Sequence, residues 1–156
     1  MNNIKVFCDG SCSVHDPRFN GAHCAVIDIP GEKPYAILGG INETTISKME
    51  IKAAAAALVH LLELAQKGLI PAGVDTVELY SDSSYVVGCA TGDSKILANK
   101  PQWAEFLTAH AMLGEYIKNI MIIKIGRNTE PEAEAADRIA GELRELLYGY
   151  RTGRLC

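Results

Sequence analysis

The sequence TVELYSDSSYVV, residues 76–87, predicts a strand that ends in the acid Asp82 and is followed by a short helix. Before this strand, the segment SKMEIKAAAAALVHLLELAQKG provides about six turns of good helix formers, from Ser47 to the stop signal Gly68. A long helix between two strands normally makes the strands parallel through a right-handed crossover. We therefore expect the strand before Asp82 to pair in parallel with a strand that precedes the helix.

Three strand-like runs precede that helix, and one more follows it. IKVFCDG alternates in strand period, and AHCAVIDI and YAILGGI are separated by the turn-forming PGEKP. Further on, QWAEFLTAHAMLGEYI predicts a second long helix, IMIIKI a fifth strand, and PEAEAADRIAGELRELLYGY a last helix. The predicted fold class is α/β, with a five-stranded mixed sheet, three antiparallel strands then two parallel, and helices on both faces. We assign residues 1–148 to a single domain and residues 149–156 to a short C-terminal tail.

The composition is that of a soluble globular domain. The chain has 156 residues, of which 48% are hydrophobic and 22% charged. The opening MNNIKVFC lacks the features of a secretory signal, and no apolar run approaches the roughly 20 residues of a membrane span. Five cysteines without zinc-site spacing fit a reduced compartment. We expect a cytoplasmic protein with no membrane association.

The net charge does not decide whether the partner is a nucleic acid. A formal charge of -4 argues at first against one, because phosphate binding depends largely on Lys and Arg. If four of the carboxylates bind two divalent cations, however, the sum becomes -4 + 4 = 0. Charge alone therefore leaves nucleic-acid binding open.

Two aspartates follow strands that we expect to be parallel neighbours. Asp9 and Asp82 each read as the last residue of a strand, and ligands of open α/β sheets bind beyond the carboxyl ends of parallel strands. Side by side, two carboxylates repel each other unless a cation lies between them. Each aspartate alone has an ordinary explanation as a turn or cap residue.

Two further acids lie in predicted helices. Glu50 has an ordinary explanation too, as the partner of an N-cap Ser47 in the capping box SKME. Asp137 is less easily explained, because it lies inside the last helix beside Ala133 and Ala140, where aspartate is a poor helix former. If Asp137 faces the inner side of the helix, its carboxylate needs a partner there. The alternative is an acid that is exposed or paired with Arg.

Four local motifs contain these acids: FCDGSC, TTISKMEIKAAAAAL, YSDSSYV and GRNTEPEAEAADRIA. In this order they closely resemble the motifs of type 1 ribonuclease H, and the resemblance runs from about Ile4 to Leu147. It implies an RNase H-like fold and an endoribonuclease that hydrolyses the RNA strand of RNA/DNA hybrids by two-metal-ion phosphodiester cleavage. The expected products carry 5'-phosphate and 3'-hydroxyl ends.

The resemblance also implies the metal ligands, and oxygen-only ligands suit Mg2+ or Mn2+, with two ions when the substrate is bound. Asp9 would bridge the ions. Asp82 and Glu50 would complete one site, and Asp137 would complete the other. We expect no small-molecule organic cofactor and a monomeric protein.

Substrate-binding residues follow from the same resemblance. The 2'-hydroxyl that distinguishes RNA from DNA would be read around the first two acid motifs, and a DNA phosphate would be bound just before the glutamate helix. These expected residues are Gly10, Ser11, Cys12, Ser47 and Ser84 for the RNA strand and Thr45 for the DNA strand. Each could equally be an ordinary turn or cap residue.

The chain departs from the family pattern in two places. Where family members commonly carry a histidine, ten residues before the last aspartate, this chain has Arg127, which cannot act as a general acid or base at neutral pH but can hold a phosphate. We include Arg127 among the catalytic residues on that basis. In place of a basic protrusion, the chain offers only Lys95, Lys100 and Trp103, and we expect Trp103 to belong to the core. The tail YGYRTGRLC could add a nucleic-acid contact or be a solvated terminus.

Two other readings remain open at this stage. The chain could be a nuclease of the same superfamily with another nucleic-acid substrate, or a catalytically weak module that binds hybrids. A generic small-molecule-binding α/β domain is disfavoured, because neither G-x-G-x-x-G nor G-x-x-x-x-G-K-[ST] occurs.

Overall fold

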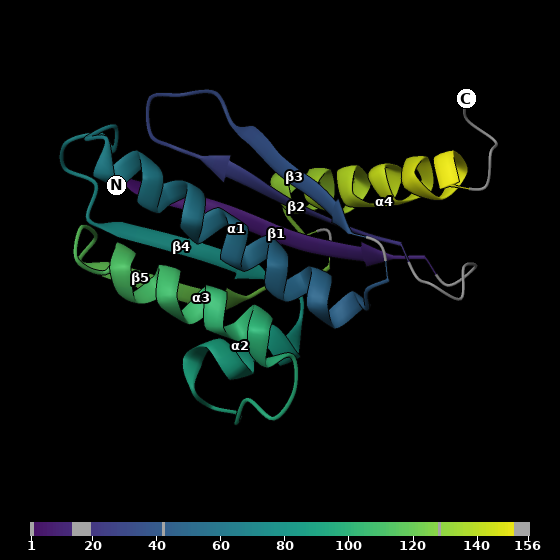
Figure 1. The fold of residues 1–156 in the computed structure, drawn as a ribbon. Coiled ribbons are helices and arrows are strands. Elements are labelled where there is room, and N and C mark those ends of the chain that lie inside the picture. The colour runs from purple at the N-terminus through teal and green to yellow at the C-terminus, as the bar shows by residue number, and fades with distance from the viewer. Residues whose placement is uncertain (1, 14–19, 42, 128, 152–156) are drawn as a thin grey trace.

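The computed structural model describes residues 2–13, 20–41, 43–127 and 129–151 (Figure 1). The strands are β1 (Asn3–Cys12), β2 (Gly21–Asp28), β3 (Tyr35–Ile41), β4 (Thr76–Ser81) and β5 (Asn119–Lys124). The helices are α1 (Ile46–Gln66), α2 (Ser84–Thr91), α3 (Lys100–Leu113) and α4 (Pro131–Arg151). The stop signal for α1 is confirmed, because Gly68 adopts a left-handed conformation with φ of 69° directly after the helix cap Lys67.

One mixed sheet organises the fold, in the strand order β3-β2-β1-β4-β5. β1 and β3 both run antiparallel to β2, whereas β1, β4 and β5 are parallel to one another. The predicted α/β class, the mixed sheet and the parallel pairing of β4 with a strand that precedes α1 are therefore confirmed. This topology places the carboxyl ends of β1 and β4 at the same edge of the sheet.

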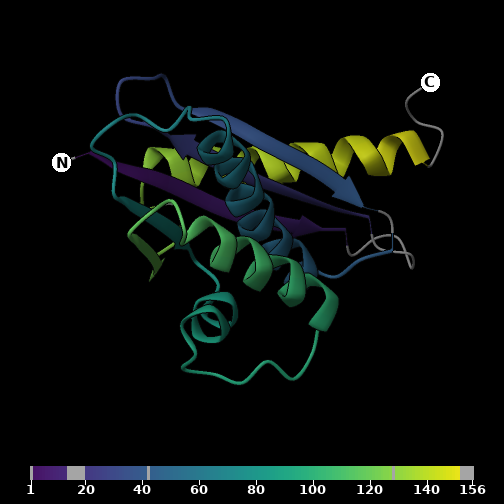
Figure 2. The same cartoon turned by 60° about the vertical axis from the view of Figure 1, so that its left-hand side comes forward.

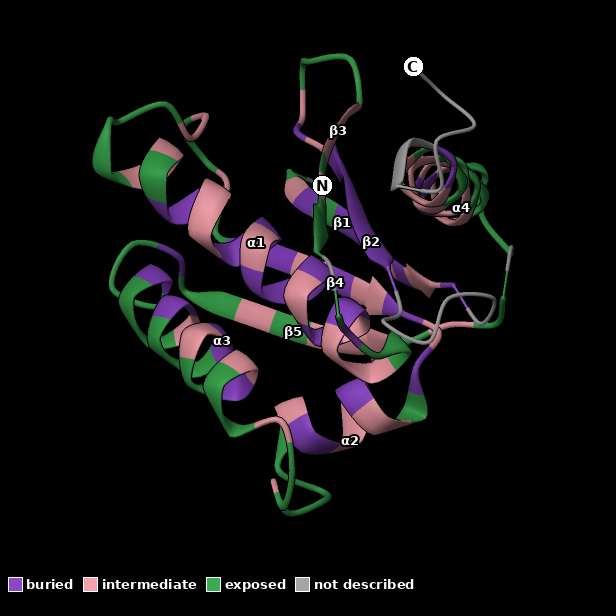
Figure 3. Ribbon diagram, turned by 45° about the vertical axis from the view of Figure 1, so that its right-hand side comes forward, coloured by how far each residue is buried: buried purple, intermediate pink, exposed green. Residues whose placement is uncertain are grey.

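Helices cover both faces of the sheet. Figure 2 shows α1 and α3 side by side on one face, and Figure 3 shows α4 alone on the other. Alternation along β1 supplies both cores, since Ile4 and Val6 join the cluster under α1 and α3 whereas Phe7 packs with α4 residues. Trp103 is 1% exposed within the first cluster, which confirms its predicted core position.

The end of β1 differs from the prediction. Asp9 is not the last residue of the strand, because β1 continues to Cys12 by antiparallel pairing with β2. The parallel pairing with β4 ends earlier, at Cys8 opposite Ser81, because the chain after β4 turns into α2. Asp9 therefore lies within β1, one residue beyond the last pair that β1 forms with β4.

The start of α1 also differs from the prediction. Thr45, not Ser47, is the N-cap, and its hydroxyl oxygen accepts a hydrogen bond of 3.3 Å from the backbone N–H of Lys48. Ser47 lies inside the first turn, so Glu50 is not the acidic partner of a capping box. The ordinary explanation for Glu50 is thereby removed.

The last helix extends beyond residue 148. α4 runs to Arg151, and the rest of the expected tail, residues 152–156 with Arg154, lies outside the described residues. In the part of the chain that the structure describes, no helix is both long enough and apolar enough to cross a membrane.

Candidate active site

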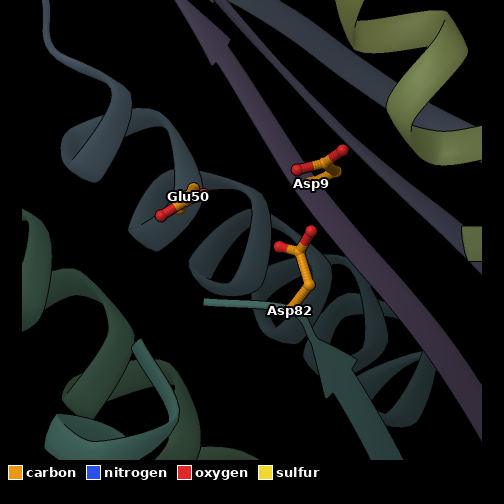
Figure 4. Close-up of side chains that lie close together, drawn as sticks. All are labelled: Asp9, Glu50 and Asp82. Carbon is orange, nitrogen blue, oxygen red and sulfur yellow. The ribbon is translucent and has the colours of Figure 1, made fainter. Parts of the chain in front are cut away.

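Three carboxylates from distant parts of the sequence meet beyond the last pair of the parallel strands β1 and β4. Asp9, Glu50 and Asp82 each offer an oxygen atom that lies within 4.8 Å of the other two (Figure 4). Asp9 and Asp82 each come one residue after the last β1–β4 pair, so the parallel register places them next to each other. Figure 4 shows Glu50 reaching the same space from α1.

Gly10 explains how α1 comes so close to β1. A Cβ atom at this position would lie 2.5 Å from the backbone nitrogen of Glu50 and 2.6 Å from the carbonyl carbon of Met49. Only glycine therefore allows the helix backbone to rest on the strand. The side chain of Ser83 then hydrogen-bonds to Glu50, and its oxygen also accepts a 3.2 Å bond from Val86 N–H at the start of α2.

Asp137 approaches the group from the opposite face of the sheet. Its neighbours Ala136 and Ala140 are buried against Phe7 in the second core cluster, and their small side chains let α4 lie close to β1. The Asp137 side chain hydrogen-bonds to that of Asp9. Asp9 thus contacts acids from both layers of helices.

Arg127 is the positively charged partner of Asp137. Its Nη2 atom lies 3.7 Å from Oδ1 of Asp137, and the two side chains are 75% and 35% exposed. An ion pair this long and this exposed contributes little to stability. Arg127 therefore remains available to another anion.

Burial and neighbouring charge raise the pKa values of two of the acids, Asp9 and Glu50. Burial is the main reason that the pKa of Asp9 is raised from 3.8 to about 8. The hydrogen bond with Asp137 and the charges of Asp82 and Asp137 raise this pKa further, whereas a 2.9 Å bond from the N–H of Gly10 lowers it. Burial also raises the pKa of Glu50, against the hydrogen bond from Ser83. The site holds more negative charge than its own side chains neutralise.

These side chains border a cavity of about 520 Å³. Most of the residues expected from the sequence line this cavity. Ser47 and Ser84 do not line it, and Ser84 is exposed at the start of α2. The expected residues that line it are Asp9, Gly10, Ser11, Cys12, Thr45, Glu50, Asp82, Arg127 and Asp137.

Sequence reasoning missed several residues of this site. Thr44, Ile46 and Arg144 also line the cavity, and Ser83 bonds to Glu50. Arg144 could have been found, because it follows Asp137 by seven residues and so lies on the same face of the helix. No pattern in the sequence marks the others.

The profile of the RNase H family matches residues 1–143. The chain belongs to the RNase H family. Ribonuclease H from Erythrobacter litoralis is 29% identical over 162 residues, which cover 94% of this chain and 99% of the relative. Ribonuclease H from Rhizobium etli is 30% identical over 156 residues, which cover 90% of each protein. The chain is accordingly a ribonuclease H enzyme, as the motifs predict.

Solved structures of RNase H proteins share the fold. The N-terminal RNase H domain of a Mycobacterium tuberculosis protein has a TM-score of 0.74 at 18% identity. The match covers 97% of this chain and 99% of the chain in that structure. LC11-RNase H1, crystallised in complex with an RNA/DNA hybrid, has a TM-score of 0.70 at 21% identity. The match covers 89% of this chain and 94% of the chain in that structure. These similarities confirm the RNase H-like architecture.

The donor set of the site fits the divalent-metal dependence of the RNase H family. Every ligand that the cluster offers is a carboxylate oxygen, the type that hard divalent cations prefer. Among the ion pairs of the described residues, Asp137 is the one acid of the four with a cationic partner. A bound cation would offset both the burial and the repulsion that raise the pKa of Asp9.

Proposed function

We propose that this enzyme hydrolyses the RNA strand of RNA/DNA hybrids with two Mg2+ or Mn2+ ions, leaving 5'-phosphate and 3'-hydroxyl ends. One observation carries the proposal: oxygen atoms of Asp9, Glu50 and Asp82 lie within 4.8 Å of one another. Asp137 hydrogen-bonds to Asp9 from α4, on the other face of the sheet. An arrangement of acids on both sides of one carboxylate suits two cations that share it.

The four acids would divide between two cation sites. Asp9 would contribute to both, because it lies between the pair Glu50 and Asp82 and the single acid Asp137. When bound, the ions would supply a nucleophile from water and stabilise the oxygens of an in-line phosphoryl displacement. The chain's own contribution is to place Glu50 beside Asp9 and Asp82, through the close contact of Gly10 with α1 and the interaction of Ser83 with Glu50.

The cavity floor would recognise the RNA strand. Gly10, Ser11 and Cys12 continue β1 past Asp9 and line the cavity, where backbone groups and small side chains can meet a 2'-hydroxyl. Thr45 lies at the opposite wall, and its hydroxyl, which already accepts from Lys48 N–H, keeps its proton free to donate to a DNA phosphate. Ser47 and Ser84 lie outside the cavity, so we assign them no contact.

Arg127 would hold a phosphate beside the acids. It stays protonated at neutral pH, so it replaces the family histidine as a fixed charge and not as a proton donor or acceptor. Its weak pairing with Asp137 leaves the guanidinium able to turn toward substrate or product.

Cleavage of matched duplexes tests the proposal. An RNA/DNA hybrid, double-stranded RNA and double-stranded DNA, each labelled on one strand, would be incubated with Mg2+, Mn2+ or a chelator. We expect cleavage of the RNA strand of the hybrid alone, abolished by the chelator and by Asp9→Asn. Asp28→Asn, at the end of β2 and outside the cavity, is the matched control and should leave activity unchanged.

The products decide the chemistry. A 3'-hydroxyl can be extended by a polymerase and a 5'-phosphate can be joined by a ligase, so both reactions should succeed on the fragments. Cleavage of double-stranded RNA or DNA instead would indicate another nuclease of the superfamily. Binding of the hybrid without cleavage in either metal would indicate a binding module.

A further inference from the structure

Arg144 is a cation at the active-site cavity that the proposed chemistry leaves unused. It lies on α4, about 10 Å along the helix axis from Asp137 at 1.5 Å per residue, and it lines the same cavity. Its side chain is 30% exposed, and its Nε atom is buried with no hydrogen-bond partner among the described residues. A buried, unsatisfied guanidinium N–H costs free energy unless a ligand or water meets it.

The surroundings of Arg144 suit an anion at the cavity floor. Cys12 and Ser11 line the cavity with it, and its positive charge acts on Cys12, lowering a pKa that burial raises. Its Nη2 atom is 2.6 Å from an oxygen of Glu145, but that carboxylate is 57% exposed. An exposed pair between adjacent residues is weak, and it engages only one edge of the guanidinium.

The positions of Arg127 and Arg144 indicate which strand of the hybrid these two side chains face. Arg127 and Arg144 line both this cavity and the adjoining hollow along α4, one on each side of Asp137. Thr45, expected at the DNA strand, lies on the α1 wall instead. A strand cut at the carboxylates and continuing toward α4 would pass over Ser11 and then meet Arg144.

We propose that Arg144 binds a phosphodiester of the RNA strand next to the one that is cleaved, and so positions that strand over the carboxylates. This inference rests on the proposed function. The contact belongs equally to the ground state and the transition state, because it lies away from the reacting phosphate. Its loss therefore acts on KM more than on kcat.

Steady-state cleavage of the hybrid by variants of α4 tests the inference. For Arg144→Gln we expect KM to rise about tenfold with kcat within about twofold, and the slope of log kcat/KM against log salt to fall by about 1. Arg144→Lys keeps the charge but not the planar fork, so it should keep the salt slope and lose part of the affinity. Lys33→Gln is the control, because this exposed residue between β2 and β3 lies outside both the cavity and the hollow along α4, and its loss should leave both constants unchanged.

A scan of neutral phosphate substitutions locates the contact. Hybrids would carry one uncharged methylphosphonate at successive positions of the RNA strand around the cut. At one position the substitution should raise KM for the parent and have no further effect on Arg144→Gln. Thermal denaturation of each variant would show that it is folded.

The outcomes separate the two proposals. If the parent cleaves the hybrid while Arg144→Gln keeps its KM and salt slope, or if Lys33→Gln is equally impaired, the Arg144 contact is refuted and the proposed function stands. Equal sensitivity of parent and Arg144→Gln at every substituted position also refutes the contact. If the parent cleaves no hybrid, the proposed function itself fails.

Discussion

Replacing Asp9 with asparagine should stabilise the metal-free protein. In the unfolded chain Asp9 loses its proton near its ordinary pKa of 3.8, whereas in the folded chain it keeps the proton up to about pH 8. Its contribution to stability is therefore present below about pH 4 and is lost as the pH rises to about 8. Asparagine cannot ionise, so the variant avoids this loss.

The size of the effect follows from the same values. A rise in pKa from 3.8 to about 8 corresponds to a ceiling of about 6 kcal/mol, at about 1.4 kcal/mol per pH unit. The cavity opens to solvent, and Asp9 shares its repulsion with Asp82 and Asp137, so most of this is screened or redistributed. We expect Asp9→Asn to raise the free energy of unfolding at pH 8 by about 2 kcal/mol, or the melting temperature by about 4–8 °C.

Thermal denaturation in a chelator at pH 4 and at pH 8 is the assay. The gain should appear at pH 8, shrink toward pH 4, and reverse in sign at saturating Mn2+, because the parent alone would then gain the full binding energy of the ions. Asp28→Asn, outside the cavity, should show no such pattern. A destabilised Asp9→Asn at pH 8 without metal would refute the reasoning.

The other predictions concern activity. Arg127→Ala should lower hybrid cleavage by about tenfold at every pH, as expected for one lost charged contact to phosphate; activity equal to the parent at every pH would remove the role of Arg127. Gly10→Ala should displace α1 from β1, lowering both the melting temperature and cleavage, and normal values of both would contradict the tight contact. Lys95→Gln with Lys100→Gln should change KM by less than about threefold at low salt, because no basic protrusion surrounds them; a larger loss would reveal one.

The fold was largely predictable because its signals are local. Alternation marked β1, apolar runs marked the other strands, and runs of helix formers marked the long helices. The crossover rule then allowed the parallel β1–β4 pairing that places Asp9 beside Asp82. The four acids could be chosen because their motifs, in order, resemble those of type 1 ribonuclease H; among the acids taken singly, only Asp137 was hard to explain otherwise, since it lies inside a helix beside alanines.

The details that were missed depend on tertiary contacts. Thr44, Thr45 and Ser47 can each cap a helix by sequence, and only the hydrogen bond from Lys48 N–H to the hydroxyl of Thr45 shows where α1 starts. The end of β1 could not be placed, because antiparallel pairing to Cys12 depends on β2 and not on the residues after Asp9. Arg144 was missed although its spacing from Asp137 places it on the same face of the helix, because only the folded structure shows that this face borders the cavity.

The central claim is that the acidic cluster exists to hold cations. Anomalous diffraction from crystals of the parent protein grown with Mn2+ measures this directly, since only the metal would give a strong signal at the manganese edge. We expect a peak bonded to oxygens of Asp9, Glu50 and Asp82 at about 2.0–2.2 Å. Carboxylates bonded to one another or to water, with manganese absent at a concentration that supports cleavage, would contradict the account.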